Sequence, residues 1–483
     1  MTVRPAAIAL VAFALAGCTS PGEADGRRPR LADCRLAGVD SVAHCGSLEV
    51  WEDRQSRKGR RIAIRFAVLP ARRRAAEPDP IVVLAGGPGQ AAMALGPQVL
   101  PLFSRLNDTR DIVLIDQRGT GESHALDCDD DKLPLQYAFE ETLPEQLVKE
   151  CAQRLDADPR HYLTTPAMAD VDEILGALGY SRVNLWGGSY GSRAALEFLR
   201  RHPSRVRTVT LDGVAPMGMK LPLSFVADGD AAFERMLFDC ESDRLCAKAY
   251  PELRRNLSRL RAHLARHPEQ VSITDPVTGE QDSIRVTESV FLSGLFRPLY
   301  LPELASVLPF GITMAAAGDF NALLAQNLEL AQDVSDNLSV GMHLSVLCSE
   351  DIPRITQEDL DQAGKSFFGR ALVDDFIRAC KWWPRGEVPS DYYEPVRSDA
   401  PVLILSGGVD PATPSRHAEE VAAMLPNSRQ FVAPNLAHGV SLHGCAPRLI
   451  ERFIRAGSAA QVDGSCLARI PRPLFLLPVG TRP

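Results

Sequence analysis

A serine flanked by glycines is the first feature of this sequence that could perform chemistry. The run Gly187-Gly188-Ser189-Tyr190-Gly191 follows an apolar stretch at residues 183–186 and precedes a helical pattern. A G-x-S-x-G run between a strand and a helix is typical of a nucleophile elbow, where glycines leave room for a tight turn that exposes the serine. We therefore predict that Ser189 is a nucleophile; a glycine-rich turn without catalysis is the alternative.

A serine nucleophile needs a base and an acid that orients the base, and two later loops could supply them. Asp410 follows an apolar stretch at residues 402–405, and His438 follows another at residues 429–432. The chain order serine, acid, histidine is one in which such triads occur. Two alternatives stay open: Asp212, which ends an earlier strand pattern, could be the acid, and His443 could be the base.

The negative charge that develops during acyl transfer needs backbone donors. We expect one from the amide of Tyr190, directly after the nucleophile, and one from Gly87 in the loop Gly86-Gly87-Pro88-Gly89. The same loop also matches the dinucleotide fingerprint G-x-G-x-x-A, which is a competing interpretation. The complete triad elsewhere favours the first interpretation, so we expect neither an organic cofactor nor a metal.

The elements that must position these residues alternate between strand and helix patterns. Short, continuous apolar runs at residues 81–85 and 112–116 suit strands that are buried on both faces. Further strands are expected at residues 46–52, 61–69, 183–186, 206–211, 401–405 and 429–432, with helices at 168–178, 192–201, 415–425 and 447–456. This alternation predicts an α/β fold with a mostly parallel central sheet.

The alternation stops between residues 215 and 399, where the sequence favours helices, for example at 231–239, 252–266 and 321–333. An insertion that leaves a parallel sheet after one strand and returns at the next is expected to form a lid. The predicted organisation is a signal peptide (1–17), a tether (18–33), a first core part (34–214), the lid (215–399) and a second core part (400–483).

The composition and net charge of the chain argue against two classes of protein. The 483 residues carry 53 basic and 61 acidic side chains, a net charge of −8, and no long Lys/Arg tract. These values argue against a nucleic-acid-binding protein. Apolar residues make up 45% and charged residues 24% of the chain, which is usual for globular proteins and argues against disorder.

The N-terminus and the cysteines point to export. An apolar run at residues 6–16 follows Arg4 and has the length of a signal-peptide core, too short to span a bilayer. The segment Leu15-Ala16-Gly17-Cys18 resembles a bacterial lipobox, which predicts lipidation at Cys18 and attachment to the cell envelope; a plain secretory signal is the alternative. Ten further cysteines suggest disulfides, and nearest-neighbour pairing is the simplest hypothesis: 34–45, 128–151, 240–246, 348–380 and 445–466.

Several motifs together resemble one known group of enzymes. The loop at residues 86–89, the string Asp116-Gln-Arg-Gly-Thr-Gly-Glu-Ser123, the elbow, residues 410–413 and His438-Gly439 are similar to the proline iminopeptidase and tripeptidyl aminopeptidase group of α/β hydrolases. The elbow tyrosine and the cysteines resemble the exported tripeptidyl aminopeptidases. Cys348-Ser349-Glu350 resembles a C-x-Asp/Glu motif of that subgroup, which implies that Glu350 binds the substrate amine, with Asp351 as the second candidate.

The resemblance implies a serine aminopeptidase that acts on peptides with a free N-terminus, removing single residues or tripeptides. A carboxylesterase with the same triad is the alternative because ester and amide chemistry share it. A catalytically silent binding protein of the cell envelope is a third reading. Asp116 and Arg118 are expected to stabilise loops beneath the site rather than to react.

Overall fold

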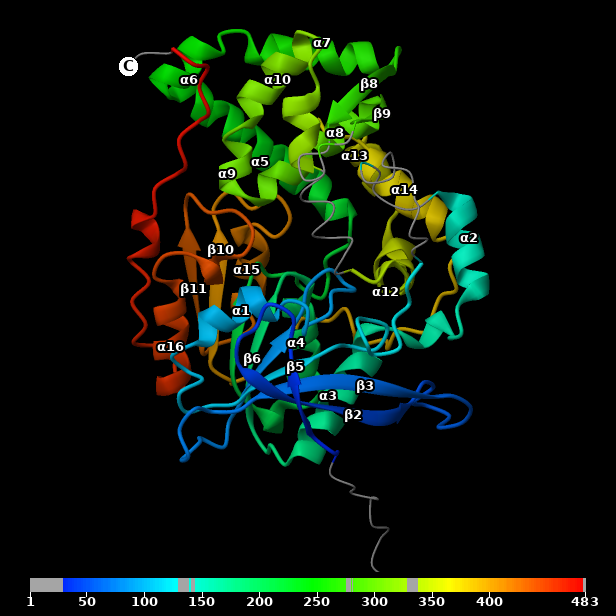
Figure 1. The fold of residues 1–483 in the computed structure, drawn as a ribbon, viewed down its shortest axis with the longest axis vertical. Helices are drawn as coiled ribbons and strands as arrows, with labels where there is room; N and C mark the ends of the chain where they lie inside the picture. Colours follow the sequence, from blue (N-terminus) through cyan, green and yellow to red (C-terminus); the bar gives the residue numbers. More distant parts are fainter. Residues whose placement is uncertain are drawn as a thin grey trace, which may run out of the picture.

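In the computed structural model of this protein, residues 29–128, 139, 144–274, 279, 281–327 and 338–480 are described. One nine-stranded sheet organises the chain (Figure 1). In spatial order its strands are β1 (Ala32–Arg35), β2 (Val42–Trp51), β3 (Arg61–Leu69), β5 (Ile112–Ile115), β4 (Ile81–Leu84), β6 (Val183–Gly188), β7 (Val206–Asp212), β10 (Val402–Gly407) and β11 (Ser428–Ala433). The expected α/β fold with a mostly parallel sheet is confirmed.

The sheet is antiparallel at one edge and parallel through its centre. Strands β1, β2 and β3 pair antiparallel, as does β3 with β5, and every pairing from β5 through β4 to β11 is parallel. All residues of β4, β5 and β10 are buried, as expected for strands covered on both faces. β1 was not anticipated, because its four residues are mostly exposed and carry no apolar run.

Two apolar cores flank the sheet. One includes residues of α3 (Thr164–Leu178), α4 (Tyr190–Arg201) and α15 (Ser415–Ala422), and the other includes residues of α1 (Gly96–Phe103) and α16 (Ala446–Ala456).

The helix after β4 begins only at Gly96, so no helix N-terminus lies at residues 87–89, where a dinucleotide site would need one.

Between β7 and β10 the chain leaves the sheet and forms a third apolar core; we call residues 215–399 the lid segment. Its larger helices gather beyond the carboxyl ends of β10 and β11 (Figure 1). Its helices and turns are α5 (Leu223–Ser242), α6 (Arg244–Ala249), α7 (Leu253–Leu264), α8 (Glu288–Phe296), η4 (Arg297–Tyr300), α9 (Pro302–Ala305), α10 (Leu308–Ala316), α12 (Val340–Val346), η5 (Leu347–Asp351), η6 (Ile352–Arg354), α13 (Gln357–Ala363) and α14 (Ala371–Ala379).

The lid segment also contains an antiparallel pair that was not anticipated, β8 (Glu269–Thr274) with β9 (Gln281–Val286). The helices expected at 231–239 and 252–266 lie largely within α5 and α7. The helix expected at 321–333 is helical over 321–327, and its remainder lies outside the described residues.

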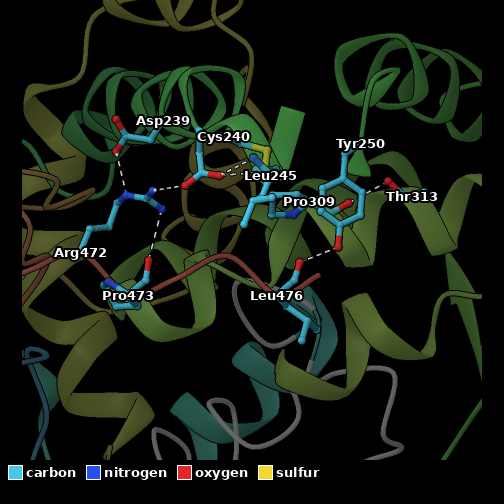
Figure 2. The surroundings of a disulfide bond; sticks show 11 residues. Asp239, Cys240, Leu245, Tyr250, Pro309, Thr313, Arg472, Pro473 and Leu476 are labelled. Carbon is cyan, nitrogen blue, oxygen red and sulfur yellow. Dashed lines mark hydrogen bonds and ion pairs between the residues drawn. A yellow bond between two sulfur atoms is a disulfide. The ribbon is translucent and has the colours of Figure 1, made fainter. Parts of the chain in front are cut away.

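The C-terminal segment returns from the core to the lid segment; we call residues 470–478 the strap. The backbone of Leu476 donates to Ser306 at 3.1 Å and accepts from the hydroxyl of Tyr250 at 2.5 Å. The guanidinium of Arg472 lies 3.9 Å from the carboxylate of Asp239, and Figure 2 shows this ion pair and the bond of Leu476 to Tyr250 near the disulfide of Cys240. The strap therefore fastens one end of the lid segment to the part of the chain that forms the central sheet.

The described residues contain five disulfides, and their pairing is the nearest-neighbour pairing expected: 34–45, 128–151, 240–246, 348–380 and 445–466. Such a set forms in oxidising compartments, so the chain folds outside the cytoplasm. Cys18, the lipobox and most of the tether lie outside the described residues. Within the ranges described, no helix has both the length and the apolar character needed to cross a membrane.

The string at residues 116–123 is buried beside the sheet. Arg118 is fully buried and pairs with Asp170 through two hydrogen bonds, at 2.7 and 2.9 Å, while donating to the backbone carbonyl oxygen of Glu52. Asp116 accepts a hydrogen bond from the amide of Met93 at 2.8 Å. These contacts tie loops together beneath the site, which is the structural role expected for the motif.

Candidate active site

Ser189 occupies a strained turn between β6 and α4. Its φ and ψ are 56° and −128°, a region that residues with a side chain rarely adopt. The flanking glycines are required by space, because a Cβ on Gly187 would lie 2.2 Å from the carbonyl oxygen of Gly191. A Cβ on Gly191 would lie 2.0 Å from the carbonyl oxygen of Leu84. The turn therefore has the geometry predicted for a nucleophile elbow.

Asp410 and His438, which the sequence places on separate loops, are in contact. Nδ1 of His438 lies 2.9 Å from Oδ2 and 3.1 Å from Oδ1 of Asp410. Asp410 also accepts hydrogen bonds from the amides of Ala412 and Thr413 and from the Thr413 hydroxyl, at 2.8, 2.9 and 2.8 Å. Because Nδ1–H donates to the carboxylate, Nε2 is the ring nitrogen left to accept a proton.

The two groups shift each other's pKa in opposite directions. Burial alone would raise the pKa of Asp410, but the charge and hydrogen bond of His438, with the two backbone amides, hold this pKa below its usual range. Burial alone would lower the pKa of His438, but the carboxylates of Asp410 and Asp212 raise this pKa above its usual value. This is the electrostatic pattern of an imidazole prepared to hold a proton during catalysis.

The elbow and the histidine loop meet at the end of β7. The amide of Ser189 donates to the backbone carbonyl oxygen of Asp212 at 2.9 Å. A Cβ added to the next residue, Gly213, would lie 3.2 Å from Cε1 of His438. The segment 212–213 is therefore bonded to Ser189 and leaves no room for a side chain between itself and His438.

The loop expected to supply the second oxyanion donor lies against the nucleophile. A Cβ on Gly86 would lie 3.3 Å from Cβ of Ser189, so this loop passes close to the serine. Gly87 has a φ of 104°, and its amide remains the proposed donor alongside that of Tyr190, the first residue of α4.

Within the described ranges, no group of three or more His, Cys, Asp or Glu side chains could hold a metal ion.

Glu350 lies deep beneath the elbow, in a π-helical turn of the lid segment. Its carboxylate accepts from the amide and the hydroxyl of Thr164, both at 2.8 Å, and from the hydroxyl of Tyr392 at 2.5 Å. The Thr164 hydroxyl also lies 2.6 Å from that of Tyr190, which links Glu350 to the elbow. Burial raises the pKa of Glu350 to about 7. Hydrogen bonds through Thr164 thus connect this carboxyl to Tyr190 of the elbow, and its burial outweighs the nearby charge of Arg193.

Asp351, the second candidate for amine binding, is engaged differently. Its carboxylate and the guanidinium of Arg193 form a fully buried ion pair at 2.9 Å, and Arg354 approaches the same carboxylate at 3.1 Å. Its charge is already neutralised within the protein. The amine proposal below therefore rests on Glu350 alone.

The alternatives for acid and base are placed elsewhere. His443 is partly buried on the turn after His438, and the structure brings His438, rather than His443, to Asp410. The carboxylate of Asp212 accepts from two backbone amides, those of Val440 and Ser441. Asp212 thus lies beside the histidine loop without bonding to the imidazole nitrogen that Asp410 holds.

Comparison with known proteins fits this geometry. Residues 79–444 match the family model described as the alpha/beta hydrolase fold, which spans the elbow, the lid segment and the loops of Asp410 and His438. The chain belongs to the α/β hydrolase family. The enzyme class expected from the sequence, a serine hydrolase or peptidase, is confirmed by the names of the relatives.

Three relatives of this α/β hydrolase illustrate the range of similarity. It is similar to serine protease Hip1 of Mycobacterium tuberculosis, 25% identical, with 95% of this chain and 96% of the relative covered. Proline iminopeptidase of Neisseria gonorrhoeae is 29% identical, over 28% of this chain and 32% of the relative. Tripeptidyl aminopeptidase of Streptomyces coelicolor is 24% identical, over 80% of this chain and 76% of the relative.

Some residues of this α/β hydrolase site carry no signal in the sequence. Tyr300 packs its ring against the imidazole of His438, with centroids 5.1 Å apart, although it belongs to the lid segment. Thr164 and Tyr392 hold Glu350 from two other elements. An isolated tyrosine or threonine in a helical or loop pattern has no spacing that marks it, so only the packing of the lid segment on the core finds them.

Proposed function

We propose that this protein is an exported serine aminopeptidase that removes single residues or short peptides, tripeptides included, from free N-termini. The observation that carries the proposal is the hydrogen bond between Asp410 and Nδ1 of His438, on a loop that meets the strained Ser189 elbow at residues 212–213. The names of the relatives support peptide substrates.

In the proposed mechanism the hydroxyl oxygen of Ser189 bonds to the scissile carbonyl carbon as its proton moves to Nε2 of His438. Asp410 holds the imidazole and stabilises its positive charge. The amides of Gly87 and Tyr190 donate to the oxyanion. When the intermediate collapses, the C–N bond breaks and the leaving amine takes the proton from His438. The N-terminal fragment remains as an ester on Ser189.

The second half of the cycle repeats these steps with water. His438 takes a proton from a water molecule while the oxygen of that water bonds to the acyl carbon. His438 then gives the proton to the oxygen of Ser189 as the ester bond breaks. The products are the free carboxylic acid of the removed fragment and the original enzyme. Each step needs only the groups named and water.

Selection of a free N-terminus is assigned to Glu350. A substrate ammonium buried in the site needs an opposite charge, because an unpaired buried charge is expensive. The raised pKa of Glu350, about 7, is that of a buried carboxyl without enough compensating charge, and an ammonium would supply it. The lid segment, residues 215–399, is proposed to exclude the middle of long chains, which would make the enzyme an exopeptidase.

The proposal is tested with three substrates: a peptide naphthylamide with a free N-terminus, its N-acetylated form, and a short acyl ester. Preferred hydrolysis of the free peptide, abolished in Ser189→Ala and in His438→Ala, is expected. Preference for the ester, with no dependence on a free amine, would instead establish a carboxylesterase. Failure of Ser189 to react with a fluorophosphonate probe would indicate a non-catalytic binding protein.

Attachment to the cell envelope through a lipid on Cys18 is also proposed. One acyl chain holds a protein only marginally, whereas two or more anchor it stably. The full-length protein is expected in the membrane fraction and to be released by Cys18→Ala. Release of the wild type into the soluble fraction would leave the plain secretory alternative.

A further inference from the structure

A second buried carboxylate lies beside the proposed base and has no part in the mechanism above. Asp212 is the last residue of β7, and its side chain is buried. Its Oδ1 accepts from the amide of Val440 at 2.9 Å, and its Oδ2 accepts from the amide of Ser441 at 2.7 Å. These two amides follow His438 by two and three residues, so Asp212 holds the loop that carries the imidazole.

The backbone of the same residue holds the nucleophile. The carbonyl oxygen of Asp212 accepts from the amide of Ser189 at 2.9 Å, and this contact lies outside the regular pairing of the strands. Asp212 is therefore bonded to the nucleophile through its main chain and to the loop of the base through its side chain. A displacement of either loop relative to the other would break one of these bonds.

We propose that Asp212 is a positioning residue that sets Ser189 and His438 relative to one another and places a negative charge beside the imidazolium. The inference rests on the proposed function of the site, but assigns Asp212 a role separate from that of the triad acid. Proton transfer between two side chains depends on sub-ångström placement, so a residue bonded to both of their loops affects the reaction without touching the substrate.

Two other roles for Asp212 fit less well. As the triad acid it would need to bind Nδ1 of His438, which is held by Asp410, and its own oxygens accept from backbone amides. As a purely structural anchor it would have no electrostatic effect on the imidazole. The groups that face His438 in the described residues are Asp410 and the Thr413 hydroxyl on the loop after β10, Asp212 at the end of β7, and the ring of Tyr300 from the lid segment.

Whether Asp212 is charged distinguishes the proposed positioning role from that of a purely structural anchor. Burial raises the pKa of Asp212, while hydrogen bonds from Ser441 and Val440 lower it. If the side chain is ionised at working pH, it raises the pKa of His438, and its removal must lower that pKa. A neutral anchor would leave the pKa of His438 unchanged.

The experiment compares Asp212→Asn with Val440→Pro in the full-length protein. Asparagine keeps the size but not the charge, and its single oxygen cannot serve both amides. Proline at position 440, the first residue of a short helical turn, removes one amide donor and leaves the charge of Asp212. The pH dependence of kcat/KM on an acyl ester is measured for both variants, with thermal melting to verify folding.

We expect Asp212→Asn to lower kcat about tenfold or more, because a misplacement of about 1 Å can cost a reaction about a hundredfold in rate. The acid limb of its kcat/KM profile, which reports the pKa of His438, should move to lower pH. Val440→Pro should lower kcat without moving that limb downward. A folded Asp212→Asn with an unshifted limb, or Val440→Pro with wild-type kcat, would overturn the inference. If Asp212→Asn does not fold, the Val440→Pro result decides whether Asp212 positions the loop of His438.

Failure of this inference and failure of the proposed function can be told apart. Titration of the His438 imidazole by nuclear magnetic resonance in wild type and Asp212→Asn needs no turnover. A lower imidazole pKa in the variant supports the coupling even if wild type hydrolyses no substrate. Hydrolysis by wild type with identical imidazole titration in both proteins would leave the proposed function standing and remove the role of Asp212.

Discussion

The ring of Tyr300 meets the imidazole of His438 edge to face, with the ring centroids 5.1 Å apart and the planes at 71°. The carbonyl oxygen of Tyr300 also accepts from the amide of His438 at 3.3 Å. Tyr300 belongs to η4 of the lid segment, whereas His438 follows the last strand of the sheet. The lid segment therefore contacts the proposed base directly.

Removal of the Tyr300 ring should make the position of the His438 imidazole less well defined. Aromatic pairs contribute about 0.5–1.5 kcal/mol beyond the area they bury, so Tyr300→Ala should lower kcat by up to about tenfold. Tyr300→Phe keeps the ring and should retain most of the activity. The measurement is ester hydrolysis by the folded variants. Equal losses for the two variants would show that the hydroxyl, and not the ring, matters.

Glu350→Gln should separate substrates by their N-terminus. The change removes the charge proposed to bind the ammonium, and losing one member of a buried charge pair costs about 2–4 kcal/mol in kcat/KM for free-amine peptides. Hydrolysis of acyl esters should change little. Glu358→Gln, an exposed carboxylate in the same segment, is the control and should have no effect. Equal losses on esters and free peptides would remove Glu350 as the amine anchor.

The same glutamate should make stability depend on pH. Its pKa of about 7 in the folded chain lies above its ordinary value of 4.5, so folding favours the protonated form. This contribution is fully present below about pH 4.5 and is lost as the pH rises through 7. The melting temperature of wild type should therefore fall between pH 5 and 8 relative to that of Glu350→Gln. A constant difference across that range would contradict the assignment.

The acid limb of kcat/KM should lie above the ordinary histidine value of 6.5, because neighbouring carboxylates raise the pKa of His438. Activity requires the neutral imidazole and so should rise with pH through this raised value. Esters are the suitable substrates, since they avoid the titration of a substrate amine. Asp410→Asn should lose most activity; an acid limb below 6.5 in wild type would contradict the prediction.

Breaking the pair of Arg193 and Asp351 should destabilise the protein. Both side chains are fully buried, and removing one partner of such a pair costs about 3–5 kcal/mol of unfolding free energy. Asp351→Asn should therefore lower the urea midpoint strongly, and the double variant Arg193→Met with Asp351→Leu should recover part of the loss. Any activity of folded Asp351→Asn should fall equally on esters and free peptides, unlike that of Glu350→Gln.

The central sheet could be predicted from the sequence because its physics is local. The runs at 81–85 and 112–116 are apolar without interruption, which is what a strand covered on both faces requires. The loops of Asp410 and His438 follow such strands, and the structure brings the two residues into contact. The cysteine pairing was also accessible, since each cysteine bonds to its nearest neighbour along the chain.

Other features depend on packing between distant segments. The strands β8 and β9 bury only Ile273, Ile284 and Val286, too few to produce an alternating pattern. The contact of Tyr300 with His438 exists only once the lid segment lies on the core. The double attachment of Asp212 involves backbone groups, which no residue type reveals.

The strap has a consequence for the order in which the chain folds. Its residues follow both parts of the sheet along the chain, yet Leu476 bonds to Tyr250 and Ser306, and Phe475 is buried against the lid segment. The lid segment therefore cannot complete its packing until the strap, which follows both parts of the sheet, is available. Until then the lid core is exposed to proteases and chaperones, so a chain shortened after Ile470 should be cleaved in its lid segment under conditions in which the full chain resists.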